Sequence, residues 1–186
     1  MKHFYQNIDS NPTWFDFQDL YSEMVKQADD KAHFVEIGAW LGRSTAYMMV
    51  EIINSGKNIL FDVVDTFKGD GLADQAKVVA EHHGSVLQEF RKNLMPVLDR
   101  IHNVLVMDSV NASIFYDDNS LDFVFDDGAH DYPHVLRDNK SWIYKVKKGG
   151  VHAGHDIQLP SVKKAVREVF GQDYTIVGTS WVHRRK

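Results

Sequence analysis

Short apolar segments alternate along this chain with longer amphipathic segments, and no other feature limits its fold as strongly. The strand-like segments span residues 33–37, 59–65, 103–107, 121–125 and 151–154. They are almost continuously apolar, as strands are when helices cover both faces of a parallel sheet. The alternation therefore predicts an α/β fold in which helices connect successive parallel strands.

The segments between the strands carry apolar residues at helical spacing. Residues 15–27 place an apolar stripe on one face of a helix, formed by Phe17, Leu20, Tyr21, Met24 and Val25. Further helices are expected at residues 44–54, 73–82, 85–98, 132–146 and 161–170. Gly56 is expected to end the first of these, and the helix at 85–98 is expected to be broken or ended near Pro96. Residues 174–177 and 181–184 are expected to close the sheet as an antiparallel pair across Gly178.

No repeat, low-complexity tract or linker divides the 186 residues, which predicts a single domain over residues 1–186. Residues 1–30 are expected to form an N-terminal helical segment, and residues 66–100 an insertion that acts as a substrate lid. No apolar run approaches the ~20 residues of a membrane span. Residues 1–10 lack the apolar stretch of a secretory signal, so a cytoplasmic location is the default expectation.

The composition excludes several classes of site. The chain has no cysteine, which excludes a disulfide scaffold, a zinc–thiolate site, an iron–sulfur cluster and a thiol nucleophile. Its 26 acidic residues outnumber the 21 basic ones, giving a formal net charge of −5, whereas nucleic-acid-binding domains are usually basic. We therefore expect no nucleic-acid partner and no membrane partner. The oligomeric state stays open, with a homodimer as one alternative.

The first strand runs into a glycine turn, with the sequence EIGAWLGRS at residues 36–44. In parallel α/β sheets, ligands bind at the carboxyl ends of the strands. This turn differs from the dinucleotide pattern G-x-G-x-x-G, because Gly38 and Gly42 lie four positions apart with bulky residues between them. A pyrophosphate would also face Glu36, whereas a ligand with a cationic amino group suits that acid. Ser44 either contacts the ligand or caps the next helix.

The next two strand ends also carry polar residues. Asp65 ends the second strand, where an acid can accept hydrogen bonds from ribose hydroxyls or cap the following turn. Asp108 and Ser109 follow the third strand, although both residue types are common in turns.

Acids and histidines gather after the fourth and fifth strands. If these strands are neighbours, Asp127, His130, His155 and Asp156 converge at one edge of the sheet. Two carboxylates with imidazoles suit a divalent cation, and a cation offsets the repulsion between the acids. Alternatively, Asp127 and Asp156 are turn residues, and His155 is an edge histidine with ordinary hydrogen bonds. His134 could pair with His130 on one helix face, but Pro133 between them suggests that His130 precedes the helix.

Taken together, these segments resemble class I S-adenosylmethionine-dependent methyltransferases. Residues 36–44 are similar to motif I of that family, and the resemblance extends over residues 34–170. The other segments that carry it are DTFKGD at 65–70, FDDGAHDY at 125–132, Trp142, KGG at 148–150, AGHD at 153–156 and VKKAV at 162–166. They resemble the small bacterial branch near macrocin-type sugar O-methyltransferases and cephalosporin-type enzymes.

The resemblance implies a Rossmann-like three-layer α/β/α sandwich with a mostly parallel seven-stranded sheet and an antiparallel last strand. It implies S-adenosylmethionine as cofactor, bound by Glu36, Gly38, Ala39, Gly42, Ser44, Asp65, Thr66, Asp108, Ser109 and Asp127. In metal-dependent relatives the positions of Asp127, His155 and Asp156 hold Mg²⁺, and His130 matches a proposed general base. The catalytic residues implied are thus His130 and Asp127.

Two departures from the family pattern bear on this assignment. Relatives often carry Asp-Gly-Asp-His where this chain has Asp-Gly-Ala-His, so Ala129 departs from the pattern. Some relatives also have Glu at the position of His155. An imidazole ligand admits Mn²⁺, Fe²⁺ or Zn²⁺ beside Mg²⁺.

The hypothesis from the sequence is a metal-assisted O-methyltransferase that acts on a hydroxyl of a small molecule or sugar. An alcohol is a poor nucleophile at neutral pH, but a cation lowers its pKa and a histidine can take its proton. The alternatives are a metal-independent N-methyltransferase, a non-catalytic cofactor-binding protein of the same fold, and a metal-dependent hydrolase or hydroxylase. An NAD dehydrogenase is the least favoured because of the glycine turn.

Overall fold

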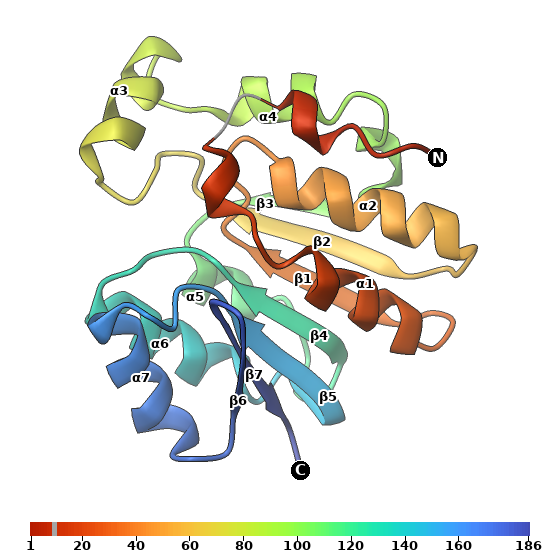
Figure 1. Cartoon of the computed structure of the whole chain (residues 1–186), viewed down its shortest axis with the longest axis vertical. Coiled ribbons are helices and arrows are strands. Elements are labelled where there is room, and N and C mark those ends of the chain that lie inside the picture. The colour runs from red at the N-terminus through yellow and green to blue at the C-terminus, as the bar shows by residue number, and fades with distance from the viewer. Residues whose placement is uncertain (9–10) are drawn as a thin grey trace.

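A seven-stranded sheet forms the centre of the molecule, in the order β3-β2-β1-β4-β5-β7-β6 (Figure 1). The computed structural model describes residues 1–8 and 11–186. The strands are β1 (His33–Ile37), β2 (Leu60–Asp65), β3 (Asn103–Val106), β4 (Leu121–Asp126), β5 (Val146–Gly154), β6 (Thr175–Val177) and β7 (Ser180–Arg184). Neighbours from β3 to β5 are parallel, whereas β7 is antiparallel to both β5 and β6. The predicted mostly parallel sheet with an antiparallel last strand is confirmed.

Helices cover both faces of the sheet, so the fold has the three expected layers (Figure 1). One layer contains α1 (Gln18–Gln27), α2 (Arg43–Ser55) and α4 (Leu87–Asn93), and the other contains α5 (Ser109–Ser113), α6 (Tyr132–Trp142) and α7 (Pro160–Phe170). α3 (Ala73–Glu81) stands at one end of the molecule, away from the sheet (Figure 1). Three 3-10 turns complete the described elements: Tyr5–Asn7, Pro12–Trp14 and Leu98–Arg100.

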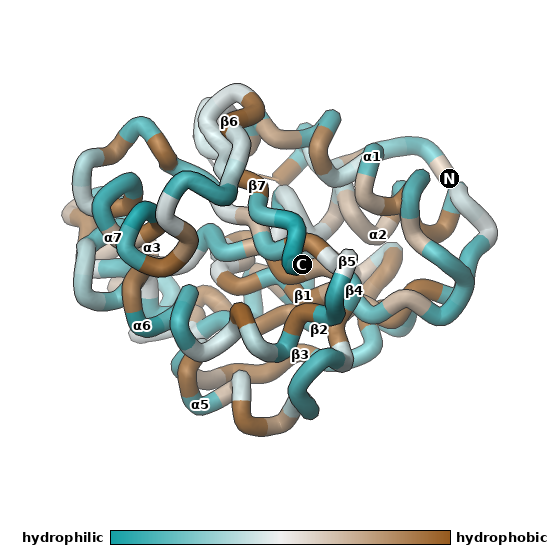
Figure 2. The backbone as a smooth tube through the Cα atoms, turned by 90° about the horizontal axis from the view of Figure 1, so that it is seen from below, coloured by the Kyte–Doolittle hydropathy of each residue, from teal (hydrophilic) through white to brown (hydrophobic). Residues whose placement is uncertain are grey.

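Alternate residues of the central strands enter two different cores. In β1, Phe34 packs with residues of α1 and α2, whereas Val35 and Ile37 pack with residues of α5 and α6. Figure 2 shows that hydrophobic residues lie along the strands at the centre of the molecule. Each such side chain, fully buried, contributes about 1.5–3 kcal/mol to folding. Burial on both faces explains why the strands read as continuous apolar runs.

Several helix boundaries differ from the prediction. The first helix begins at Gln18, because the preceding residues form a 3-10 turn and an extended link. The helix expected at 85–98 ends at Asn93 and is followed by turns around Pro96, since proline disfavours helical backbone in the residue before it. The short helix α5 was not predicted. It forms because the Asp108 carboxylate accepts the Val110 amide N–H at 3.0 Å.

The prediction was also wrong at the start of β5. The helix expected over residues 132–146 ends at Trp142, and Val146 instead pairs with Leu121 of β4. The strand was expected to begin at residue 151, but it begins at Val146 and includes Gly149 and Gly150. The β4–β5 register shifts between Leu121 and Phe123, and a Cβ on Gly150 would lie 3.0 Å from the Asp122 carbonyl oxygen. Gly150 therefore allows the two strands to approach closely at this irregularity.

The strand order reverses between β1 and β4, which places β2 and β3 on one side of β1 and β4 and β5 on the other. The loops after these strands diverge at this point, and such a switch point is where open α/β sheets bind ligands. Within the predicted N-terminal segment, Asp9 and Ser10 lie outside the described residues. Across residues 1–8 and 11–186, no helix has the length and apolarity to cross a membrane.

Candidate active site

A cleft of about 810 Å³ opens where β1, β2, β4 and β5 end. This volume falls in the range of sites that enclose a small molecule. Of the predicted site residues, those that line the cleft are Gly38, Ala39, Ser44, Asp65, Thr66, Asp108, Ser109, Asp127, His130, His155 and Asp156. Glu36 and Gly42 do not line it. Residues 13–17 and the start of the 66–100 segment close its remaining sides.

Gly38 lets the ends of β1 and β4 come together below the cleft. Its φ is +84°, and a Cβ at this position would lie 2.1 Å from the carbonyl oxygen of Asp127. No side chain fits there, and few residues other than glycine adopt this backbone conformation. Gly42 is needed for a different contact, because a Cβ there would lie 2.6 Å from the Leu94 side chain. It allows α2 to begin against α4, and a direct contact with the cofactor stays a prediction.

Asp65 holds the glycine turn in place from the end of β2. One carboxylate oxygen accepts the backbone N–H groups of Ala39 at 2.7 Å and Trp40 at 2.8 Å, and the other accepts that of Phe67 at 2.6 Å. Trp40 and Phe67 both have positive φ, so these bonds stabilise two strained turns. Burial raises the pKa of Asp65, and the three backbone hydrogen bonds oppose that rise.

Glu36 lies beneath the cleft and is only 1% exposed. Its carboxylate accepts hydrogen bonds from the Tyr21 hydroxyl, at 2.9 Å, and from the Thr45 hydroxyl. Burial raises the pKa of Glu36 to about 7, although hydrogen bonds from Thr45, Ser44 and Tyr21 oppose the rise. The residue therefore joins β1 to α1 and α2, and the predicted contact with the cofactor stays untested.

A second polar group borders the cleft at the start of α5. Asp108 caps this helix and forms an ion pair with Arg137 of α6. The Ser109 hydroxyl donates to Asp138, which is buried on the same helix. These contacts fix Asp108 and Ser109, two of the predicted cofactor-binding residues, to α6.

His130 lies between two carboxylates. Its Nδ1 atom is 2.9 Å from Asp70, which comes from the 66–100 segment, and its Nε2 atom is 2.7 Å from Asp156. Asp156 follows β5 with a φ of +58°, a conformation that is costly for a non-glycine residue. Strain of this kind often occurs where a side chain must point into a functional site.

His155 also contacts Asp156, and its second carboxylate partner is Asp127. Its Nδ1 atom lies 3.4 Å from Asp127 and 3.3 Å from Asp156. Its Nε2 atom lies 2.9 Å from both Asp16 and Thr179, and the Thr179 hydroxyl also donates to Asp16 at 2.6 Å. The N-terminal segment thereby reaches the centre of the cleft.

The charges in this cluster are strongly coupled. The hydrogen bond to Asp156 raises the pKa of His130 to about 9, even though burial lowers it. Burial also lowers the pKa of His155, but hydrogen bonds to Asp127 and Asp156 outweigh this and raise it to about 11. Burial raises the pKa of Asp127, partly offset by His155. With only these partners, both imidazoles keep their protons at neutral pH, and neither can act as a base.

The donor set fits a divalent cation. Asp127, His130 and Asp156 each offer a ligand atom within 4.8 Å of the other two, and Nδ1 of His155 faces the same two carboxylates. Carboxylate oxygens with one imidazole suit Mn²⁺ and related ions. His134, the alternative partner of His130, is instead paired with Asp131 at 2.6 Å.

Sequence reasoning did not single out Asp16, Asp70, Thr179 or Arg137. The only signal for Asp70 was its place at the end of the DTFKGD segment, and nothing local marked the other three. Each of them orients a predicted site residue from a distant part of the chain.

Comparisons with known proteins show the family and the fold of the chain. A family model described as a methyltransferase domain matches residues 35–157. None of the curated proteins compared with the chain matches it. Solved structures that share the fold include the O-methyltransferase NovP, with 20% identity over 91% of this chain and 79% of that chain and a TM-score of 0.65.

Two further solved structures show the same likeness in fold. CalS11, a TDP-rhamnose 3'-O-methyltransferase of calicheamicin biosynthesis, is 13% identical over 90% of this chain and 76% of its own, with a TM-score of 0.58. The cofactor-bound protein Rv0187 from MTB is 17% identical over 98% of this chain and 86% of its own, with a TM-score of 0.59. Because the family model covers the greater part of the chain, including every strand end that lines the cleft, the chain belongs to the methyltransferase-domain family and is a class I S-adenosylmethionine-dependent methyltransferase.

Proposed function

We propose that this methyltransferase transfers its methyl group to a hydroxyl of a small molecule or sugar, with the help of a divalent cation. The observation that carries the proposal is the cluster of Asp127, His130, His155 and Asp156 at the cleft. An amine acceptor needs little activation, whereas an alcohol needs both a lower pKa and a base. NovP and CalS11, which share the fold, are O-methyltransferases, and the CalS11 acceptor is a sugar.

S-adenosylmethionine supplies an electrophilic methyl group on a sulfonium, so the protein has to position a nucleophile and take its proton. The cleft residues Gly38, Ser44, Asp65, Asp108 and Ser109 would hold this cofactor along the switch point. The Asp127–His155–Asp156 side would then face the methyl group and the acceptor.

Asp127, His155 and Asp156 would hold the cation. His155 has the arrangement typical of a metal-bound imidazole, since one nitrogen faces the two carboxylates while the other contacts Asp16 and Thr179. A cation held there would lower the pKa of an acceptor hydroxyl.

His130 would take the acceptor proton. The contact of its Nδ1 atom with Asp70 fixes the ring and leaves Nε2 to face the cleft beside Asp156. With a cation bound to its carboxylate, Asp156 would hold the proton on His130 less strongly, and Nε2 could then accept the proton of the acceptor hydroxyl. The state of the Asp156 carboxylate would therefore determine whether His130 acts as an acid or as a base.

The test uses purified protein, S-adenosylmethionine with a labelled methyl group, and parallel panels of sugar and phenol hydroxyls and of amines. We expect transfer to a hydroxyl that requires Mn²⁺ or Mg²⁺ and stops on chelation. Transfer to amines that continues after chelation would instead support a metal-independent N-methyltransferase. The absence of nucleic-acid and membrane partners, the cytoplasmic location and a homodimer stay predictions.

A further inference from the structure

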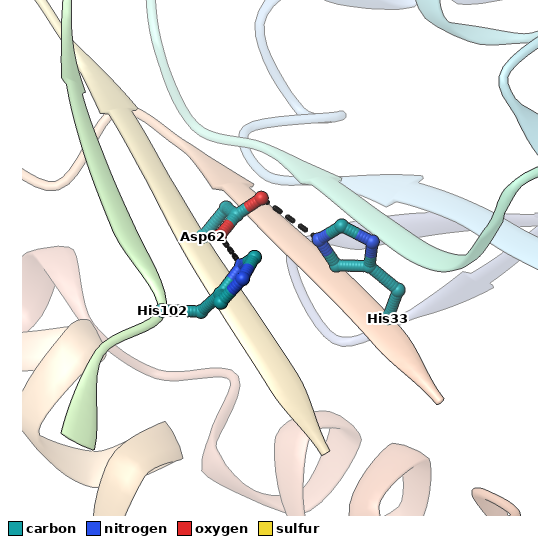
Figure 3. Close-up of side chains that lie close together, drawn as sticks. All are labelled: His33, Asp62 and His102. Atoms are coloured by element: carbon teal, nitrogen blue, oxygen red, sulfur yellow. Dashed lines mark hydrogen bonds and ion pairs between the residues drawn. The ribbon is translucent and has the colours of Figure 1, made fainter. Parts of the chain in front are cut away.

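Two histidines and an aspartate meet at the opposite edge of the sheet, where the strands begin. His33 opens β1, Asp62 lies in β2, and His102 directly precedes β3. Figure 3 shows the two imidazoles on either side of the Asp62 carboxylate. We call these three residues the strand-start site. None of them lines the cleft, so methyl transfer does not account for them.

The geometry of the strand-start site is that of converging ligands. Nε2 of His33 lies 2.8 Å from one Asp62 oxygen, and Nδ1 of His102 lies 2.8 Å from the other. The two rings are nearly perpendicular, at 85°, with centroids 5.7 Å apart. One ligand atom from each residue lies within 4.8 Å of the other two. A single ion can therefore contact all three side chains.

The hydrogen bonds around His102 contain a mismatch. The side-chain nitrogen Nδ2 of Asn103 lies 3.0 Å from Asp62 Oδ1 and 2.9 Å from His102 Nδ1. If Nδ1 carries a proton, two donors face each other. If Nδ1 lacks a proton, its lone pair faces the carboxylate oxygen. A cation shared by Nδ1 and the carboxylate would remove the repulsion in the second case, while the Asn103 side-chain N–H keeps Asp62 Oδ1 as its acceptor.

We propose that the strand-start site binds a divalent transition-metal ion such as Zn²⁺ through His33 Nε2, His102 Nδ1 and the Asp62 carboxylate. Two imidazoles and one carboxylate are a donor set that zinc accepts, with a fourth position left for water. Mg²⁺ and Ca²⁺ prefer oxygen ligands, so the site should favour zinc over them.

The surroundings allow the small adjustment that an ion requires. Neighbouring ligand atoms of tetrahedral zinc lie about 3.3 Å apart, so each imidazole must retreat by roughly half an ångström. The Asp62 side chain is 1% exposed and is fixed from behind by the Tyr116 hydroxyl at 2.9 Å, whereas those of His33 and His102 are 20% and 43% exposed. The ion can thus enter from solvent onto a rigid carboxylate.

A cation at the strand-start site would tie together the starts of β1, β2 and β3. Because the unfolded chain does not hold these ligands together, binding would stabilise the folded state. The role is structural, and the site lies at the sheet edge away from the acceptor chemistry.

The experiment titrates Zn²⁺ into chelator-treated protein while imidazole proton resonances and the melting temperature are followed. Four proteins are compared: the native chain, His102→Gln, Asp156→Asn, and the double variant. His102 is partly exposed, so its replacement should leave the fold intact, and circular dichroism checks this. Asp156→Asn weakens the candidate cation site of the cleft and isolates the strand-start site.

We expect Asp156→Asn to bind one Zn²⁺, with shifts of the His33 and His102 resonances and a raised melting temperature. His102→Gln should weaken binding at this site at least about 100-fold, because even loss of a residue that only supports a ligand costs about 10–100-fold. If Asp156→Asn shows no saturable Zn²⁺ binding, or if the His33 and His102 resonances stay unshifted, the three residues are only a hydrogen-bond hub and the proposal is overturned. If the cleft binds no cation, Zn²⁺ should still shift the His33 and His102 resonances, so failure of the proposed function can be told apart from failure of this proposal.

Discussion

Nδ1 of His130 lies 2.9 Å from a carboxylate oxygen of Asp70. This contact joins the loop after β4 to the segment over residues 66–100, which was predicted to act as a substrate lid. The imidazole is therefore oriented by a residue of that segment. Its other nitrogen, 2.7 Å from Asp156, faces the cleft. Opening of the segment would release the ring, so acceptor binding and the orientation of His130 should be coupled.

Replacement of His155 and replacement of His130 should have different effects on cation binding and on methyl transfer. We expect His155→Gln to weaken Mn²⁺ binding at least about tenfold, because His155 is the proposed ligand and loses its contacts to Asp127 and Asp156. We expect His130→Gln to keep Mn²⁺ binding but to lose about 10²–10⁴ in transfer rate, as for the loss of a general base. Electron paramagnetic resonance of Mn²⁺ and labelled methyl transfer measure the two effects.

His134→Gln is the matched control, because His134 sits four residues from His130 but pairs with Asp131. It should change neither quantity. If His130→Gln removed Mn²⁺ binding while His155→Gln kept it, the roles proposed for the two histidines would have to be exchanged.

Replacing Gly38 with alanine should damage the cofactor side of the cleft. The added Cβ would lie 2.1 Å from the Asp127 carbonyl oxygen, so β1 and β4 must move apart. We expect calorimetry to show at least about tenfold weaker binding of S-adenosylmethionine, together with a lower melting temperature.

Gly56→Ala provides the control for Gly38→Ala. Gly56 has a similar positive φ of +70°, but a Cβ there would meet no described residue within 4 Å apart from its immediate neighbours in the chain. This variant should cost about 1–2 kcal/mol of stability from the left-handed backbone alone and leave cofactor binding unchanged. Equal effects of the two variants on binding would show that the close approach at Gly38 is unimportant.

Asp65→Asn should loosen the glycine turn. An amide group can replace only one of the two oxygens that accept the Ala39, Trp40 and Phe67 N–H groups. Leaving a buried donor unpaired costs about 1–3 kcal/mol. We expect urea unfolding to show a loss of that size and calorimetry to show weaker cofactor binding.

An exposed acid gives the comparison for Asp65. Asp118 pairs with Lys145 at the surface, and Asp118→Asn should cost at most about 1 kcal/mol. A cofactor affinity that is the same in Asp65→Asn and in the native chain would refute the role given to Asp65.

His152 should make the fold sensitive to acid. It is fully buried, and neither ring nitrogen has a partner among the described residues. Burial, followed by the nearby His183, lowers the pKa of His152 to about 3. In the unfolded chain its pKa is close to 6.5, so between these values the unfolded state binds the extra proton. The unfolding free energy therefore does not suffer from His152 above pH about 6.5. Below that value it falls by up to about 1.4 kcal/mol for each pH unit.

We expect His152→Leu to flatten this pH dependence, measured by urea unfolding at pH about 5 and about 7.5. Replacement of the exposed His83 by glutamine should leave the slope as it is in the native chain. An unchanged slope in His152→Leu would mean that other groups determine the acid sensitivity.

The fold could be predicted in most respects because its strands are buried on both faces. Apolar continuity located β1 and β4 to within a residue. The start of β5 was missed because Gly149 and Gly150 resemble a turn. Their backbone hydrogen bonds with Arg185, and the pairing of Val146 with β4, keep them in the strand. Tertiary pairing here outweighs the local preference.

The candidate site could be predicted only where the chain geometry is regular. Asp127 and Asp156 were brought together correctly, because the ends of parallel neighbouring strands share one edge. Asp16 and Thr179 reach His155 from the N-terminal segment and the β6–β7 turn, and no local periodicity specifies where such loops lie. The orienting partners of a site are therefore harder to predict than the residues that follow strands.

The most direct test measures labelled methyl transfer from S-adenosylmethionine to sugar and phenol hydroxyls, in Mn²⁺ and again after chelation, with cofactor binding followed by calorimetry in both states. We expect chelation to stop transfer while S-adenosylmethionine still binds at the Gly38–Asp65 side of the cleft. Transfer that continues undiminished after chelation, or that occurs only to amines, would contradict the proposed metal-assisted O-methylation.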